Sequence, residues 1–216
     1  MHNRALAFAF LALVSISGPA AAGFGTLTLP EARRAVAASI QLIPADDIEF
    51  DHHARIVRIA DLDGNRVPEI VYLLSAFNTG SSSDATNELV VMTRLKAGDT
   101  RGVDPAPGTS PVLDEDYAEA RRSGYADDAS IHVPGDVTRL VIRQDGRIEV
   151  WFSSNEDSPI CKRAVETSRG RIATSHCPPP GPHRWVYAWT PGRLQRVECL
   201  DGSERAIRCE PADDGR

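Results

Sequence analysis

The sequence predicts a mainly β protein of the α+β class, an antiparallel meander of hairpins with one N-terminal helix packed on it. Three observations support this prediction. Apolar and polar residues alternate with a period near two over much of the chain after Pro44. Short segments rich in Gly, Pro, Asn and Asp separate these runs, as they do in β-hairpins. The clearest helical spacing of apolar residues lies before Pro44, over residues 29–42.

The N-terminal helix has both a start signal and a stop signal. Thr28 and Glu31 have the spacing of a capping box, and Pro30 lies in the first turn. Pro44 ends the run because proline cannot continue a helix. A later segment, 114–122, places acidic residues before basic ones and is compatible with a short helix aligned with its own dipole.

The first strands follow the N-terminal helix. Ile56, Ile59 and their neighbours form a short predicted strand. Residues 69–77 are apolar, β-branched and aromatic, which predicts a strand buried on both faces, and 87–95 repeat the pattern. The polar residues 78–86 between them indicate a hairpin loop.

Three consecutive hairpins are predicted in the second half of the chain. Their strands are residues 137–143 and 147–152, 164–167 and 171–174, and 185–189 and 193–197. The Asp145-Gly146 step of the first hairpin is the strongest signal, because both residues can adopt positive φ. In the third hairpin we expect Trp185 and Trp189 on one face and Tyr187 on the other. Such aromatic residues fill a core more often than they form a binding surface.

The first 22 residues have the three parts of a secretory signal peptide. Arg4 supplies a positive charge, and residues 5–16 form an apolar stretch shorter than the roughly 20 residues of a membrane-spanning helix. The alanines at 20–22 suit a signal peptidase, and we expect cleavage after the last of them. The predicted mature chain is one mainly β domain over 23–199 with a tail over 200–216, has no membrane span, and is periplasmic or secreted.

Four cysteines lie in the last quarter of the chain, namely Cys161, Cys177, Cys199 and Cys209. An even count in an exported chain indicates disulfides. Of the three possible pairings we favour Cys161–Cys177 with Cys199–Cys209, because each pair brackets a turn-rich segment. The rival is a zinc site that combines the first pair with His176 and His183, and it lacks the close Cys-x-x-Cys spacing of structural zinc sites.

The segment 61–69 carries the sharpest chemical signal. Oxygen-bearing groups fall at loop positions 1, 3, 5, 7 and 9, namely the side chains of Asp61, Asp63, Asn65 and Glu69 and the backbone carbonyl of Val67. Hard oxygen ligands that converge on one point suit Ca²⁺. An EF-hand is excluded, because Arg66 and Tyr72 stand where that motif requires Gly and Glu.

This segment resembles the strand–loop–strand calcium loops of the FG-GAP and VCBS repeats, found in integrin-type propellers and in many secreted bacterial proteins. The resemblance covers residues 57–72 and implies that the four side chains named above are ligands of a Ca²⁺ cofactor. Two departures from the motif bear on calcium affinity. Asn65 stands where the motif has Asp, which removes one negative charge, and Arg66 replaces the turn-forming glycine. A single copy cannot form a propeller, but such motifs also occur singly in small exported proteins.

Two interpretations of the segment remain open at this point. It binds Ca²⁺, or it is a metal-free hairpin turn whose carboxylates accept hydrogen bonds from backbone N–H groups. The same residue types favour both, since turns use Asp, Asn and Gly for their own geometry.

The function favoured by the sequence is that of an exported binding module with a protein or glycan partner and a candidate calcium loop. Lys and Arg number 24 against 30 Asp and Glu, a net charge of −6, which disfavours a nucleic-acid partner. Binding is favoured over catalysis because the common local catalytic motifs are absent. The alternatives are a secreted hydrolase whose site assembles from distant residues, or an inhibitor of such a hydrolase that uses segment 162–176.

Overall fold

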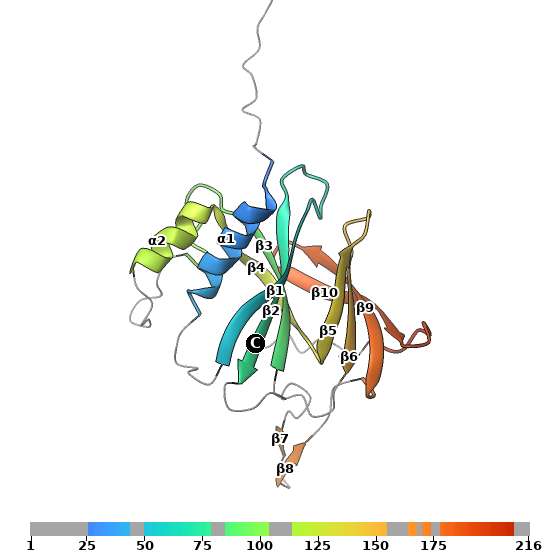
Figure 1. Ribbon diagram of the computed structural model, residues 1–216. Helices are drawn as coiled ribbons and strands as arrows, with labels where there is room; N and C mark the ends of the chain where they lie inside the picture. Colours follow the sequence, from blue (N-terminus) through green and yellow to red (C-terminus); the bar gives the residue numbers. More distant parts are fainter. Residues whose placement is uncertain are drawn as a thin grey trace, which may run out of the picture.

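In the part of the chain that the structure describes, two four-stranded antiparallel sheets, a separate two-stranded sheet and two helices are present (Figure 1). The computed structural model describes residues 26–43, 50–78, 85–103, 114–154, 164–167, 170–173 and 178–209. The two four-stranded sheets pack face to face, and the helices cover the outer face of the first sheet, so the molecule has three layers. The predicted mainly β class is confirmed.

The first sheet has the strand order β1-β2-β3-β4, a simple meander. Its strands are β1 (Phe50–Ala60), β2 (Glu69–Asn78), β3 (Ala85–Arg94) and β4 (Tyr125–Val133). The strands predicted around Ile56, over 69–77 and over 87–95 are confirmed as β1, β2 and β3. The sequence analysis did not predict β4.

The second sheet has the order β10-β9-β6-β5, and it corrects the prediction of an unbroken meander of three hairpins. Its strands are β5 (Asp136–Ile142), β6 (Ile148–Ser154), β9 (Gly181–Thr190) and β10 (Arg193–Asp201). The predicted middle hairpin forms as β7 (Ala164–Thr167) and β8 (Gly170–Ala173), but as a separate two-stranded sheet. Because β6 pairs directly with β9, this hairpin is an excursion from the sheet.

Strand β2 is buried on both faces, as predicted. Val71 and Leu73 point into the core between the two sheets, whereas Ile70 and Tyr72 point toward the helices. All four side chains are at most 1% exposed. The alternation of a strand therefore assigns one face of β2 to each of two apolar layers.

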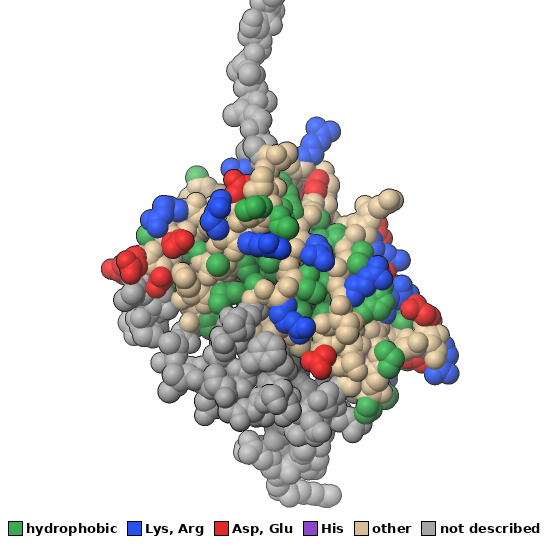
Figure 2. Space-filling view, viewed as in Figure 1, with side chains coloured by type: hydrophobic (Ala, Val, Ile, Leu, Met, Phe, Trp, Pro, Cys, Tyr) green, Lys and Arg blue, Asp and Glu red, His purple; other side chains and the backbone are tan. Residues whose placement is uncertain are grey.

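Helix α1 (Leu29–Ile40) packs on the outer face of the first sheet through Ala32, Ala35 and Val36. Its capping box forms as predicted, with Glu31 accepting hydrogen bonds from Thr28. A second helix, α2 (Asp114–Ser123), lies against α1. This helix confirms the short helix predicted over 114–122. The expectation of an N-terminal helix packed on a meander is met by α1 and the first sheet, and among the described residues α2 is added to it. Figure 2 shows that this face carries charged side chains with hydrophobic ones between them.

The aromatic residues of β9 belong to the core between the sheets. Trp185, Tyr187 and Trp189 are all buried there, at most 9% exposed. The expectation that Tyr187 lies on the opposite face is wrong, because residues two apart on a strand point the same way. The interpretation of these aromatics as core is confirmed.

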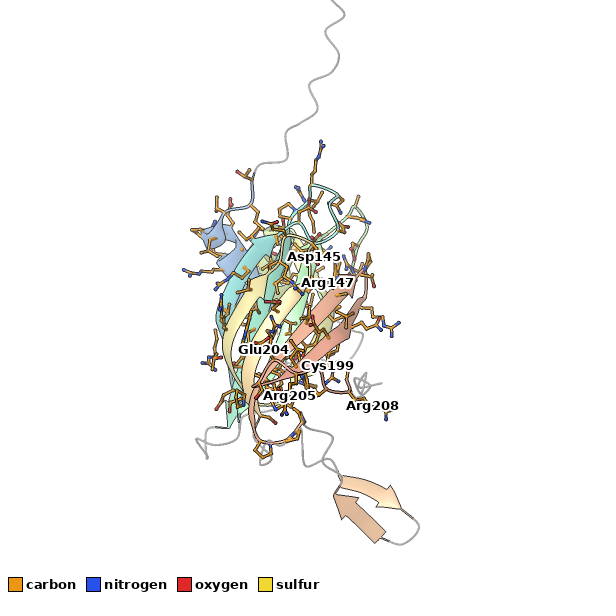
Figure 3. All side chains as sticks on the ribbon, turned by 90° about the vertical axis from the view of Figure 1, so that its right-hand side faces the viewer. Asp145, Arg147, Cys199, Glu204, Arg205 and Arg208 are labelled. Carbon is orange, nitrogen blue, oxygen red and sulfur yellow. A yellow bond between two sulfur atoms is a disulfide. The ribbon has the colours of Figure 1, made fainter. Side chains whose placement is uncertain are left out.

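The Asp145-Gly146 turn joins β5 to β6, as predicted, but with different backbone geometry. Gly146 has a φ of 77°, whereas Asp145 has a negative φ and accepts a hydrogen bond from the backbone of Arg147 at 3.2 Å. The turn therefore uses one left-handed residue, not the two of the expected type. Figure 3 shows Asp145 and Arg147 at one end of the second sheet and Cys199 toward the other.

The predicted disulfide Cys199–Cys209 is present and joins β10 to the segment that follows it. That segment folds back along β10, where the backbone N–H of Ile207 donates to the carbonyl of Cys199 at 2.9 Å. The other predicted pair, Cys161–Cys177, lies outside the described residues, as does the predicted leader. Neither described helix has the length and apolar character needed to cross a bilayer.

Candidate metal centre

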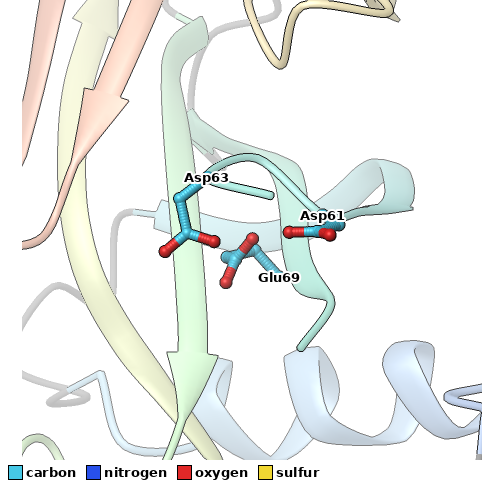
Figure 4. A group of neighbouring side chains, drawn as sticks. All are labelled: Asp61, Asp63 and Glu69. Atoms are coloured by element: carbon cyan, nitrogen blue, oxygen red, sulfur yellow. The ribbon is translucent and has the colours of Figure 1, made fainter. Parts of the chain in front are cut away.

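The loop that carries the acidic motif joins the paired ends of β1 and β2. Ala60 is the last residue of β1 and lies opposite Glu69, the first residue of β2. Asp61 therefore follows one strand directly and Glu69 begins its neighbour, so the strand pairing itself brings these two carboxylates to the same end of the sheet. Asp63 returns toward them from the loop (Figure 4).

The structure brings three of the five predicted ligands together. One carboxylate oxygen from each of Asp61, Asp63 and Glu69 lies within 4.8 Å of the other two. Two oxygen ligands of one calcium ion, each about 2.3–2.6 Å from it, are at most about 5.2 Å apart. The three carboxylates are thus already spaced closely enough to share one ion, and Asp61 and Asp63 are open to solvent.

The same carboxylates also hold the loop through backbone hydrogen bonds. Leu62 donates to Glu69 at 2.8 Å, and Arg66 donates to Asp61 at 2.9 Å. Asn65 donates its backbone N–H to Asp63 at 3.0 Å. A carboxylate has about four acceptor positions, so these bonds leave capacity for a cation. The turn chemistry expected for the loop is present, and it is compatible with ion binding.

Burial and like charge both act on Glu69. This residue is 3% exposed, and its burial raises its pKa to about 7. The hydrogen bond from Leu62 opposes the rise in pKa, and the negative charges of Asp63 and Asp61 add to it. A divalent cation between the three carboxylates would relieve their repulsion and favour the ionised form of Glu69.

The other two predicted ligands have different surroundings. The Asn65 side chain is engaged within the loop: its oxygen accepts from the backbone of Val67 at 2.6 Å, and its amide nitrogen donates to Asp63 at 2.7 Å. The Val67 carbonyl accepts no hydrogen bond from the residues that the structure describes. Val67 therefore keeps a free acceptor, whereas Asn65 would have to exchange a hydrogen bond to bind an ion.

Arg66 occupies a backbone conformation that suits glycine. Its φ is 69°, in the left-handed region, and the nearby Gly64 has a φ of 76°. The resemblance places glycine at the position of Arg66, and the geometry explains why. A side chain in this conformation costs roughly 1–2 kcal/mol.

The second sheet supports the loop through a contact that sequence reasoning missed. Leu62 packs against the core between the sheets, and its carbonyl oxygen lies against Gly146 in the β5–β6 turn. A Cβ atom at Gly146 would overlap that oxygen. No sequence signal links these residues, which lie far apart in the chain.

Each carboxylate of the cluster thus has a defined position, set by strand pairing, by loop hydrogen bonds or by both. The cluster consists of anionic oxygen ligands at the paired ends of β1 and β2, and Asp61 and Asp63 are open to solvent. No protein-family model, curated protein or solved structure matches this chain.

Proposed function

We propose that this chain is an exported binding module whose 61–69 loop takes a calcium ion, and that the ion stabilises the loop for a protein or glycan partner. The observation that carries the proposal is the spacing of Asp61, Asp63 and Glu69, whose oxygens lie within 4.8 Å of one another. Calcium takes 6–8 oxygen ligands. The Val67 carbonyl and water would complete the shell.

Charge and preorganisation favour calcium as the ion. The cluster offers only oxygen ligands, which suit Ca²⁺ or Mg²⁺ better than a transition metal. Mg²⁺ requires a tighter octahedral shell and gives up water reluctantly, whereas Ca²⁺ accepts irregular loop geometry. Because two of the carboxylates are exposed and Arg66 adds a positive charge nearby, we expect weak binding, with a dissociation constant of about 0.1–1 mM.

Calorimetric titration of the purified chain from residue 23 tests the proposal. Calcium should bind with a stoichiometry of one, and Asp61→Asn should abolish or strongly weaken the binding heat. Asp201→Asn is the matched control, because Asp201 also accepts hydrogen bonds from turn N–H groups but faces Arg205 instead of other carboxylates. The absence of binding heat at millimolar calcium, or an equal loss in the control, contradicts the proposal.

The partner is tested separately, by capture on immobilised protein with calcium and with chelator. A protein or glycan ligand that is retained with calcium and released by chelator supports a calcium-stabilised binding surface. Retention that is identical in both conditions and in Asp61→Asn would separate the partner site from the calcium loop.

A further inference from the structure

A cavity of about 550 Å³ lies on the helix side of the first sheet, remote from the core between the sheets. Its walls are α1, the end of α2, and the adjoining ends of β3 and β4. Sites for small ligands commonly have volumes of about 300–1,000 Å³. The cavity is therefore large enough for a small molecule, and neither the loop motif nor the fold accounts for it.

Arginine dominates the polar lining. Arg34 from α1, Arg94 from the end of β3 and Arg122 from the end of α2 line the same cavity. Two glutamates, Glu31 and Glu119, also line it, and the hydrogen bonds that Glu31 accepts from Thr28 lower its pKa and keep it anionic. The three arginines therefore exceed the two carboxylates by one positive charge.

Two of these arginines have uncommitted donors. Among the described residues, Arg122 donates no hydrogen bond and forms no ion pair, and the carboxylate that attracts Arg34 is the capping Glu31. A guanidinium group carries five N–H donors in a planar fork that matches carboxylate or phosphate oxygens. The lining thus presents donors that suit an oxyanion.

The chain path places Arg122 close to Arg94. Helix α2 ends at Ser123, and Gly124, with a φ of 75°, turns the chain directly into β4. Tyr125, the first residue of β4, pairs with Arg94, and the carbonyl of Gly124 accepts from Leu95 at 2.8 Å. Arg122 is therefore held near the end of β3 by strand pairing that begins three residues later.

The rest of the lining is mixed, with polar side chains from Thr26, Glu119 and Ser123 beside apolar ones. Leu27 is partly exposed and offers apolar surface, whereas Ala35 and Ala38 are only 2% exposed and contribute little of it. Figure 2 shows hydrophobic side chains among the cationic ones on the face that carries α1 and α2. A ligand that fills the cavity would therefore combine an anionic head with a short apolar part.

We propose that this cavity binds a small organic anion, with its carboxylate or phosphate on Arg34 and Arg122 and its apolar part against Leu27. This inference is independent of the calcium loop, because none of the three clustered carboxylates lines the cavity. The two head groups share one chemistry, an oxyanion recognised by guanidinium groups.

Calorimetric titration of the purified chain with octanoate, octyl phosphate and octanol tests this site. We expect one equivalent of octanoate or octyl phosphate to bind, and the tighter of the two identifies the preferred head group. Octanol, which has the same chain without the charge, should bind at least about tenfold more weakly, since each lost charge-assisted hydrogen bond has a large effect. Equal binding of octanol overturns the proposal.

The variants Arg34→Gln and Arg122→Gln should each weaken binding of the anion about tenfold. Both side chains are exposed, so the variants should fold, which circular dichroism verifies. Arg33→Gln is the matched control, because Arg33 is an exposed neighbour on α1 that does not line the cavity. An equal effect in this control, or the absence of binding by both anions at millimolar concentration, overturns the proposal.

Discussion

Arg66 shows how one residue can limit a binding loop. Its left-handed backbone, with a φ of 69°, carries a strain that glycine would not have. Its charge also lies on the loop that holds three carboxylates. We therefore expect Arg66→Gly to stabilise the protein by about 1 kcal/mol and to tighten calcium binding. Urea denaturation and calorimetric titration measure the two effects.

Glu204 supplies the control for this prediction. It is the other non-glycine residue with a left-handed backbone among those described, with a φ of 59°. Glu204→Gly should relieve similar strain but leave calcium affinity unchanged, because its turn lies on the second sheet. If both variants change calcium affinity equally, the effect of Arg66 is not local.

Glu69 should make the stability of the metal-free protein depend on pH. Its pKa is raised from 4.5 to about 7 in the folded state, so the folded protein retains a proton that the unfolded chain releases. The free energy of unfolding should therefore fall as the pH rises from about 5 to 7 and then level off. Glu69→Gln has no proton to release there and should lack this part of the decrease.

Thermal unfolding in chelator at several pH values measures this difference. The stability of Glu69→Gln relative to the unmodified protein should increase between pH 5 and 7. Glu115→Gln, at an exposed position of α2, serves as the control and should leave the profile unchanged. If the difference in stability between Glu69→Gln and the unmodified protein is the same at every pH, the raised pKa of Glu69 is contradicted.

Two adjacent aspartates explain why β4 was not predicted from the sequence. Asp127 and Asp128 are poor strand formers, and together they look like part of a loop. The structure gives each a partner: Asp127 accepts from Ser39 and Tyr72, and Asp128 accepts from Trp189 at 3.0 Å. These aspartates fit in a strand because distant residues donate hydrogen bonds to them, and strand propensity, which is a local property, does not include such contacts.

The 61–69 loop contacts the β5–β6 turn at Gly146. Gly146→Ala should destabilise the protein and weaken calcium binding, because the new Cβ would overlap the carbonyl oxygen of Leu62 in the loop. Gly192→Ala is a closely matched control: its φ is also 77°, but nothing lies within 4 Å of the added atom. Urea denaturation and calcium titration of both variants make the comparison.

In the control, Gly192→Ala, the free energy of unfolding should fall by only about 1–2 kcal/mol, which is the cost of an alanine with a left-handed backbone, and the calcium affinity should not change. Gly146→Ala should lose more stability than this. Equal losses of stability in the two variants would show that the contact between turn and loop contributes nothing.

The arrangement of the elements was only partly predictable. Period-two patterns and turn residues located β2, β3 and the strands of all three hairpins, because these signals are local. That β6 pairs with β9, leaving β7 and β8 apart, depends on which strand edges meet in space. For the candidate site, the spacing of the acidic residues predicted the convergence of Asp61, Asp63 and Glu69, but not the engagement of Asn65 within the loop.

At the scale of the whole molecule, one disulfide closes the C-terminal end. Cys199 is buried in the core between the sheets and is bonded to Cys209, ten residues later. Replacing both with alanine should lower the free energy of unfolding by about 2–3 kcal/mol, since a short loop is no longer closed in the unfolded chain. Urea denaturation measures the change, and a loss below about 0.5 kcal/mol would contradict it.

The two sheets come from successive halves of the chain. Both helices and the whole first sheet precede Pro134, and the second sheet follows it. Where the chain passes from the first sheet to the second, the side-chain amide of Asn87 donates to the carbonyl of Gly135 at 2.6 Å, and Ser75 donates to Asn87. This buried chain of hydrogen bonds ties the end of the first sheet to the start of the second.

This order has a consequence for biosynthesis. A nascent chain that has emerged as far as β4 already contains every strand of the first sheet, but the face formed by Val71, Leu73, Leu89 and Val91 still lacks its cover. Uncovered apolar strands are prone to aggregation. The period of greatest risk therefore runs from the emergence of β4 to the emergence of β10, and a chaperone that binds extended apolar segments would protect the chain during that interval.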